Sequence, residues 1–67
     1  MQKQLIMEKV KEKLFTNGSV DFGSLYVAIN MEKSITRDEL RNILKQMVDE
    51  LEITYSNVSG VKIYELA

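Results

Sequence analysis

Apolar and polar residues follow a helical period over most of this chain and a period of two near its C-terminus. The first helical stretch, residues 2–15, has one apolar side: Ile6, Met7, Val10 and Leu14. Charged residues fill the other side, so the pattern predicts an amphipathic helix. The helix is expected to end at residues 16–18, because asparagine and glycine tolerate the left-handed conformation that often follows a helix. Residues 19–20 are then free to form a short strand.

Two further helices are predicted, each preceded by a capping residue. Asp21 is a good N-cap for a helix over residues 22–30, because its carboxylate can accept hydrogen bonds from the first turn. The apolar side of that helix consists of Phe22, Leu25, Tyr26 and Ile29. After a polar connection over residues 31–35, Thr36 and Glu39 have the spacing of a capping box that begins a third helix over 37–51. Its apolar residues predict a stripe buried at the centre of the core: Leu40, Ile43, Leu44, Met47, Val48 and Leu51.

The last fifteen residues have the pattern of a β-hairpin. β-branched and aromatic residues with a period of two predict strands over residues 53–55 and 61–66. The residues between them, 56–60, are mostly turn formers and place Val58 at the expected tip. A hairpin of this size is unstable alone, so it is expected to pack on the helices.

Length and composition restrict the classes of protein to which this chain can belong. With 67 residues, we expect a single domain over residues 1–67 with one small core. The sequence contains no histidine or cysteine and no glycine-rich phosphate loop, so we expect no enzyme, no cofactor and no metal site. The acidic residues 49, 50 and 52 are interpreted as a solvated patch. No apolar run approaches the length of a membrane span, and we expect a soluble, cytoplasmic protein.

The order of the predicted elements resembles the winged-helix variant of the helix-turn-helix superfamily. The resemblance extends from the helix over 2–15, through Val20 and the helices over 21–30 and 36–51, to the hairpin over 53–66. It implies an α+β fold with three helices, a short strand between the first two, and a C-terminal two-stranded wing. The connection before the third helix is longer than in the tightest members of the superfamily and lacks their frequent glycine.

DNA-binding members of the superfamily insert the third helix into the major groove and touch the DNA backbone with the wing. The resemblance therefore implies a small transcriptional regulator that binds double-stranded DNA. Opposite the buried stripe of the third helix, Arg37, Arg41 and Lys45 lie four residues apart, with Asn42 beside them. The acidic excess of this helix lies at its C-terminal end, an arrangement that the helix dipole disfavours, so stability alone does not explain it.

Each candidate contact has a residue type that suits its expected partner. Arg41 and Asn42 are the candidates for base contacts, because arginine matches guanine and asparagine matches adenine in the major groove. Thr36, Arg37 and Lys45 are candidates for phosphate contacts. On the wing, the candidates for backbone contacts are Asn57, Ser59 and Lys62.

The net charge of −1 supports a different interpretation, because DNA-binding domains usually carry a basic surplus. The third helix then presents an ordinary solvated face, with Asp38 paired to Arg41 or Asn42, and the chain is a protein-interaction module such as an anti-repressor or a subunit of a larger complex. If the chain binds DNA, a homodimer is expected, because a two-fold site doubles the number of contacts. Leu5 and Phe15 are candidates for the dimer interface; alternatively, Phe15 caps the core and Leu5 is a scattered exposed residue.

Overall fold

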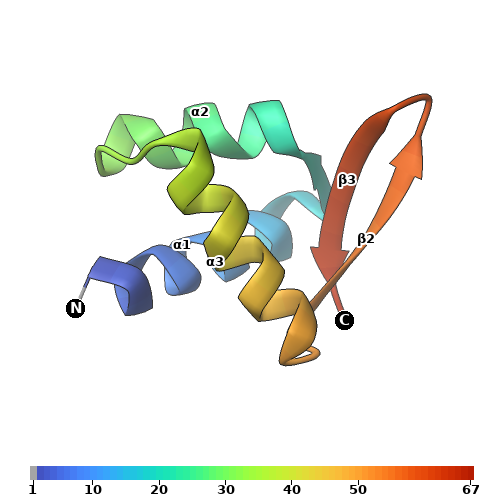
Figure 1. Ribbon diagram of the computed structural model, residues 1–67, viewed down its shortest axis with the longest axis horizontal. Coiled ribbons are helices and arrows are strands. Elements are labelled where there is room, and N and C mark those ends of the chain that lie inside the picture. The colour runs from blue at the N-terminus through green and yellow to red at the C-terminus, as the bar shows by residue number, and fades with distance from the viewer. Residues whose placement is uncertain (1) are drawn as a thin grey trace.

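In the computed structural model, which describes residues 2–67, three helices pack on one another and a two-stranded hairpin extends beside them (Figure 1). The elements along the chain are α1 (Gln2–Asn17), β1 (Ser19–Asp21), α2 (Phe22–Glu32), α3 (Arg37–Asp49), β2 (Ile53–Val58) and β3 (Val61–Leu66). This order confirms the predicted α+β architecture. Within residues 2–67, no helix has the length and apolar character needed to cross a membrane.

The three strands form an antiparallel sheet in the order β1-β3-β2. Tyr64 of β3 lies opposite Val20 of β1 on one side and Tyr55 of β2 on the other. Residues that are directly opposite in an antiparallel sheet share a face. Because Tyr64 is buried, this is the face that packs toward the helices. The short β1 thus joins the start of α2 to the sheet.

The hairpin turn is shorter than the sequence predicts. Only Ser59 and Gly60 connect the strands, and their φ angles of 53° and 81° are typical of a two-residue type I′ turn. The prediction that residues 56–60 form the turn is therefore wrong for Ser56–Val58, which belong to β2. Val58 is not at the tip but lies opposite Val61 in the ladder.

The core forms where the three predicted apolar faces meet. It contains Ile6, Met7, Val10, Leu14, Leu25, Ile29, Ile35, Leu40, Ile43, Leu44, Met47, Ile53 and Tyr64. The predicted stripes of α1 and α3 are confirmed, although Val48 is only partly buried, with one exception at the end of α3. Phe15 is 82% exposed, so the interpretation that it caps the core is wrong.

The exception is Leu51, which was expected to continue the buried stripe. Instead α3 ends at Asp49, and Leu51 lies beyond the helix with a φ of 62° and 80% of its surface exposed. The Leu51 N–H donates to the Val48 carbonyl at 3.0 Å, and the Glu52 N–H donates to the Met47 carbonyl at 2.9 Å. These two bonds form a Schellman motif, which requires a left-handed residue at the position that Leu51 occupies.

Both predicted N-caps are confirmed. Thr36 and Glu39 exchange hydrogen bonds: the Glu39 N–H donates to Thr36 Oγ1 at 3.1 Å, and the Thr36 N–H donates to Glu39 Oε1 at 2.9 Å. Hydrogen bonds that the Glu39 carboxylate accepts from Thr36, first from its backbone N–H and then from its side chain, hold the pKa of that carboxyl below its usual value. At α2, the Asp21 carboxylate accepts from the Ser24 N–H at 3.1 Å. Helix α2 continues to Glu32, so the first two residues of the expected connection over 31–35 are helical.

Candidate nucleic-acid interface

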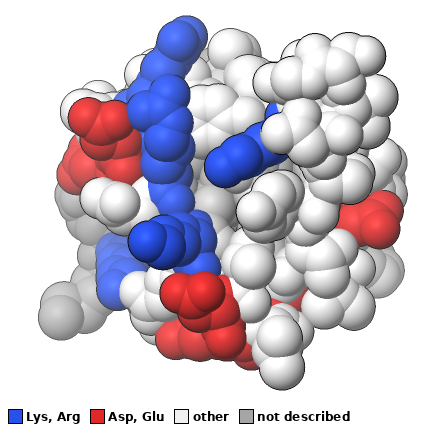
Figure 2. Space-filling model, turned by 45° about the vertical axis from the view of Figure 1, so that its right-hand side comes forward, with Lys and Arg blue, Asp and Glu red and all other residues white. Residues whose placement is uncertain are grey.

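The exposed side of α3 carries a row of basic side chains. Arg37, Arg41 and Lys45 follow one another at intervals of four residues, and all three are exposed, as is the neighbouring Asn42. Figure 2 shows lysine and arginine side chains in a nearly continuous column, with a further basic side chain set apart beside it and acidic side chains at its lower end. The capping box fixes where α3 begins and therefore which residues face outward.

Two aromatic rings from α2 lie against this row. Phe22 and Tyr26, which the sequence assigned to the apolar side of α2, are only partly buried, and their rings are stacked with centroids 6.5 Å apart and an interplanar angle of 14°. The Arg41 guanidinium carbon lies 5.3 Å from the centroid of the Phe22 ring. The Arg37 guanidinium carbon lies 5.1 Å from that of Tyr26. Cation–π contacts at exposed sites contribute about 0.5–1 kcal/mol each.

Arg41 also has an acidic partner. Its Nη1 donates to Asp38 Oδ1 at 2.8 Å, and the two side chains are 59% and 88% exposed. The Asp38–Arg41 pair considered for a solvated face is therefore present. An exposed pair of this kind contributes little to stability, but it restricts where the guanidinium lies.

A groove separates α3 from the hairpin. Arg41, Asn42 and Lys45 line one wall, and Tyr55, Lys62 and Tyr64 line the other. Lys62 Nζ lies 5.1 Å from the centroid of the Tyr55 ring, and the Tyr55 and Tyr64 rings are 5.9 Å apart.

The charged groups of the groove are mostly basic. Burial raises the pKa of the Tyr64 hydroxyl, so this group stays protonated and can donate. Asp49 lines the same groove and gives it one acidic end.

The structure brings together four of the eight predicted contact residues, Arg41, Asn42, Lys45 and Lys62. The other four do not line the groove. Thr36 and Arg37 lie at the start of α3, where the Thr36 hydroxyl oxygen already accepts the capping bond. Asn57 lies in β2 opposite Lys62, and Ser59 lies in the turn.

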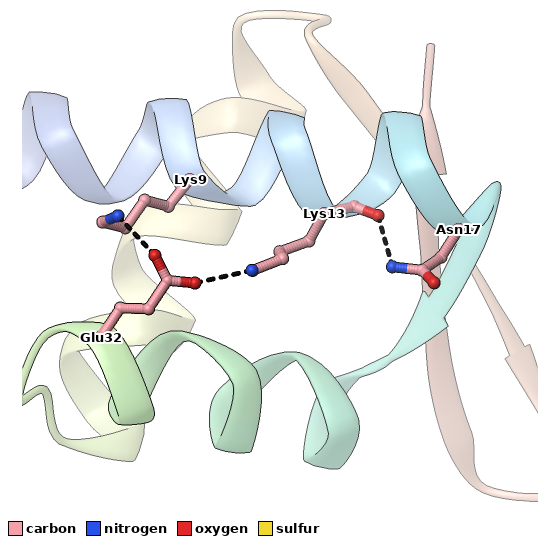
Figure 3. Close-up of polar contacts among 4 residues, drawn as sticks. All are labelled: Lys9, Lys13, Asn17 and Glu32. Carbon is pink, nitrogen blue, oxygen red and sulfur yellow. Dashed lines mark hydrogen bonds and ion pairs between the residues drawn. The ribbon is translucent and has the colours of Figure 1, made fainter.

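The lysines of α1 are mostly neutralised by acidic residues of other elements. Figure 3 shows Glu32, at the end of α2, between Lys9 and Lys13 of α1, with N–O distances of 2.7 and 2.6 Å. Hydrogen bonds from Lys13 and Lys9 lower the pKa of the Glu32 carboxyl to about 2. Lys11 pairs in the same way with Glu52.

These pairs leave a small set of cations without a carboxylate partner among residues 2–67: Lys3, Lys33, Arg37, Lys45 and Lys62. Three of them, Arg37, Lys45 and Lys62, lie on α3 or on the hairpin. The acidic patch near the end of α3 has other partners, since Glu52 pairs with Lys11 and the Glu50 carboxylate accepts from Gln46 Nε2 at 3.0 Å. The described residues contain no cluster of three side chains that would hold a metal ion.

No family model and no curated protein sequence matches this chain. A solved structure from work on the DNA recognition and protein interaction domains of HOP2, and on its homologous DNA pairing properties, aligns with a TM-score of 0.79 over 97% of each chain. The fold is a winged helix. The two sequences are 17% identical, so the likeness is one of fold. The hairpin β2–β3 is therefore the wing, and α3 is the third helix of the fold.

Proposed function

We propose that this winged helix binds double-stranded DNA and acts as a small cytoplasmic transcriptional regulator. The observation that carries the proposal is the α3–wing groove, where Arg41, Asn42, Lys45 and Lys62 converge on one surface. Phosphates attract such a surface, and its placement on α3 and the wing suits insertion of α3 into the major groove. The similar structure supports the proposal, because it comes from work on the DNA recognition and protein interaction domains of HOP2.

The contacts divide by chemistry. Arg41 and Asn42 meet base edges, because their side chains offer the bidentate patterns that match guanine and adenine. Arg37 and Lys45, together with the Thr36 hydroxyl, contact the phosphates on either side of the DNA major groove. On the wing, Lys62 meets the backbone, with Asn57 and Ser59 as weaker contacts.

Binding to DNA labelled with a fluorophore tests the proposal. Fluorescence anisotropy with a random-sequence duplex at physiological salt should show binding with a Kd of about 1–100 µM, the range of non-specific complexes. Arg41→Ala should remove sequence preference in a selected site. Lys3→Gln removes one positive charge from α1, at a residue that does not line the α3–wing groove, and should leave that preference intact. Absence of salt-sensitive binding at these concentrations would exclude the proposal.

On a two-fold DNA site, we propose that the chain binds as a homodimer. Leu5 and Phe15 of α1, 39% and 82% exposed, are apolar candidates for the interface. Sedimentation velocity with and without DNA measures the assembly. Phe15→Ser should weaken a dimer without unfolding the chain, since Phe15 lies outside the core, whereas one chain per duplex would contradict the dimer.

The charge distribution favours a second candidate, a protein-interaction module. Asp38 engages Arg41, and Asp49 lines the groove, so an acidic DNA backbone meets repulsion at both positions. This candidate predicts a complex with a protein partner that survives nuclease treatment, together with no salt-dependent shift of DNA.

A further inference from the structure

The position of Arg41 is fixed by contacts on two sides. We infer that Phe22 and Asp38 are positioning residues that hold the Arg41 guanidinium in one orientation, and that Arg41 held in this way selects guanine in the bound DNA. The inference rests on the proposed function. It assigns roles to an aromatic residue of α2 and an acidic residue of α3 that the groove alone does not suggest.

The two contacts come from different directions. The Phe22 ring lies 5.3 Å from the guanidinium carbon, so it supports the charged group from the α2 side. Asp38 Oδ1 accepts from Nη1 at 2.8 Å and fixes rotation of the group about its own axis. Phe22 is itself packed on the core and stacked with Tyr26, so the ring is a firm support.

The remaining donors of Arg41 suit a base edge. A guanidinium has five N–H donors in a rigid plane, and the pair with Asp38 uses one of them. The others are free for the O6 and N7 acceptors of guanine, which a planar bidentate group recognises in the major groove. Restricting the side chain before binding lowers the conformational entropy lost on binding.

Arg41 differs in this respect from its neighbours in the row. Arg37 has a ring, Tyr26, but no carboxylate partner among residues 2–67, and Lys45 has neither contact. Those two side chains suit phosphates, which tolerate many orientations. Only Arg41, of the three basic residues of α3, has both a ring and an acid.

Asp38 has a second effect on selectivity. Its side chain is 88% exposed beside the cation, so it repels phosphates that approach Arg41. Random DNA therefore gains less from Arg41 than a site with a correctly placed guanine gains. Removing the Asp38 charge should strengthen binding to random DNA and weaken discrimination at the same time.

The first measurement needs no DNA. ¹⁵N relaxation of the Arg41 Nε–Hε group in the free protein should show a more ordered side chain than that of Arg37. Phe22→Leu and Asp38→Asn should each increase the mobility of Arg41, and Phe22→Tyr should preserve its order because the ring remains. Val27→Ala, which removes an exposed apolar side chain from the same helix, is the control. If Arg41 in the unchanged protein is as mobile as in the variants, the positioning roles are wrong.

The second measurement uses DNA selected from a pool of random duplexes, with a non-selected duplex for comparison. The ratio of the two affinities should fall about tenfold in Asp38→Asn while binding to the non-selected duplex tightens. Arg41→Lys keeps the charge and should lose the preference for guanine, because lysine lacks the planar bidentate group. Glu8→Gln, an equal change of charge on α1, should alter neither the ratio nor the selected bases.

The outcomes separate the two proposals. No binding to either duplex overturns the proposed function and, with it, the guanine-reading role, whatever the mobility of Arg41. Binding with an unchanged ratio in Asp38→Asn and Phe22→Leu overturns only the inference. Ordered Arg41, guanine in the selected site and a reduced ratio in both variants support it.

Discussion

The salt dependence of DNA binding follows from the cations on the α3–wing surface. Four cations lie on this surface, Arg37, Arg41, Lys45 and Lys62, and each phosphate that a cation neutralises contributes about −0.9 to the slope of log K against log salt concentration. Arg41 faces Asp38 and is assigned to a base, so three cations remain, and the expected slope is about −2.7 per bound chain. Raising the salt concentration fourfold, from about 50 to about 200 mM, should then weaken binding roughly 40-fold.

Fluorescence anisotropy of a labelled duplex over this salt range measures the slope. Lys62→Gln should make the slope shallower by about 0.9, because one phosphate contact is lost. Lys3→Gln changes the net charge equally, yet Lys3 does not line the α3–wing groove and should leave the slope unchanged. The reasoning is refuted if the two variants alter the slope equally, since binding would then depend on overall charge and not on this surface. A slope near zero would refute it more directly.

Three further predictions concern stability. Glu32→Gln should lower Tm at pH 7. The pKa of the Glu32 carboxyl is about 2 in the folded chain and near 4.5 in the unfolded chain. The stabilisation that the ionised carboxylate contributes is therefore complete above about pH 4.5 and is lost as the pH falls through 2. Thermal denaturation from pH 7 to pH 2 should therefore bring the two Tm values together, and a constant gap would contradict this origin. Thr36→Ala removes the side-chain half of the capping box and should cost about 1 kcal/mol in urea denaturation, whereas Thr16→Ala, near the exposed end of α1, should cost much less. Leu51→Gly should raise stability by up to about 1 kcal/mol, because glycine adopts the left-handed conformation freely, and a lower Tm would instead show that the exposed leucine makes a stabilising contact.

The sequence predicted the parts of the fold that depend on local pattern. Apolar spacing identified α1 and α3, and single residues, Asp21 and Thr36, marked where two helices begin. The end of α3 was missed because Leu51 continues the apolar spacing, and no glycine or asparagine marks the Schellman motif. The predicted turn was too long for a related reason. Ser56 and Asn57 are polar residues that are common in turns, so the sequence pattern did not indicate that they belong to the outer part of β2.

The candidate site was predictable along α3 and at Lys62 of the wing. The four-residue spacing of Arg37 and Arg41 is visible in the sequence, and so is the option of a pair with Asp38. The contacts of the Phe22 and Tyr26 rings with the two arginines could not be predicted from the sequence, because they depend on how α2 crosses α3. Both aromatic residues also fit the ordinary apolar pattern of a helix that packs on a core. An aromatic pair at four-residue spacing before an arginine-bearing helix is the signal that could have suggested it.

Net charge is a poor guide to this surface because the ion pairs divide the charges between the two sides of the molecule. Glu32 neutralises Lys9 and Lys13, and Glu52 neutralises Lys11, so these two acidic residues pair with α1 and not with the basic row of α3. The same pairs tie α1 to the end of α2 and to the segment before β2. The acids thus stabilise the packing of the helices while leaving the cations of α3 and the wing unopposed, except by Asp38 and Asp49. A chain that is slightly acidic overall can therefore present a basic groove, and Asp49 in the groove together with Asp38 beside Arg41 restricts binding to ligands that place their charge correctly.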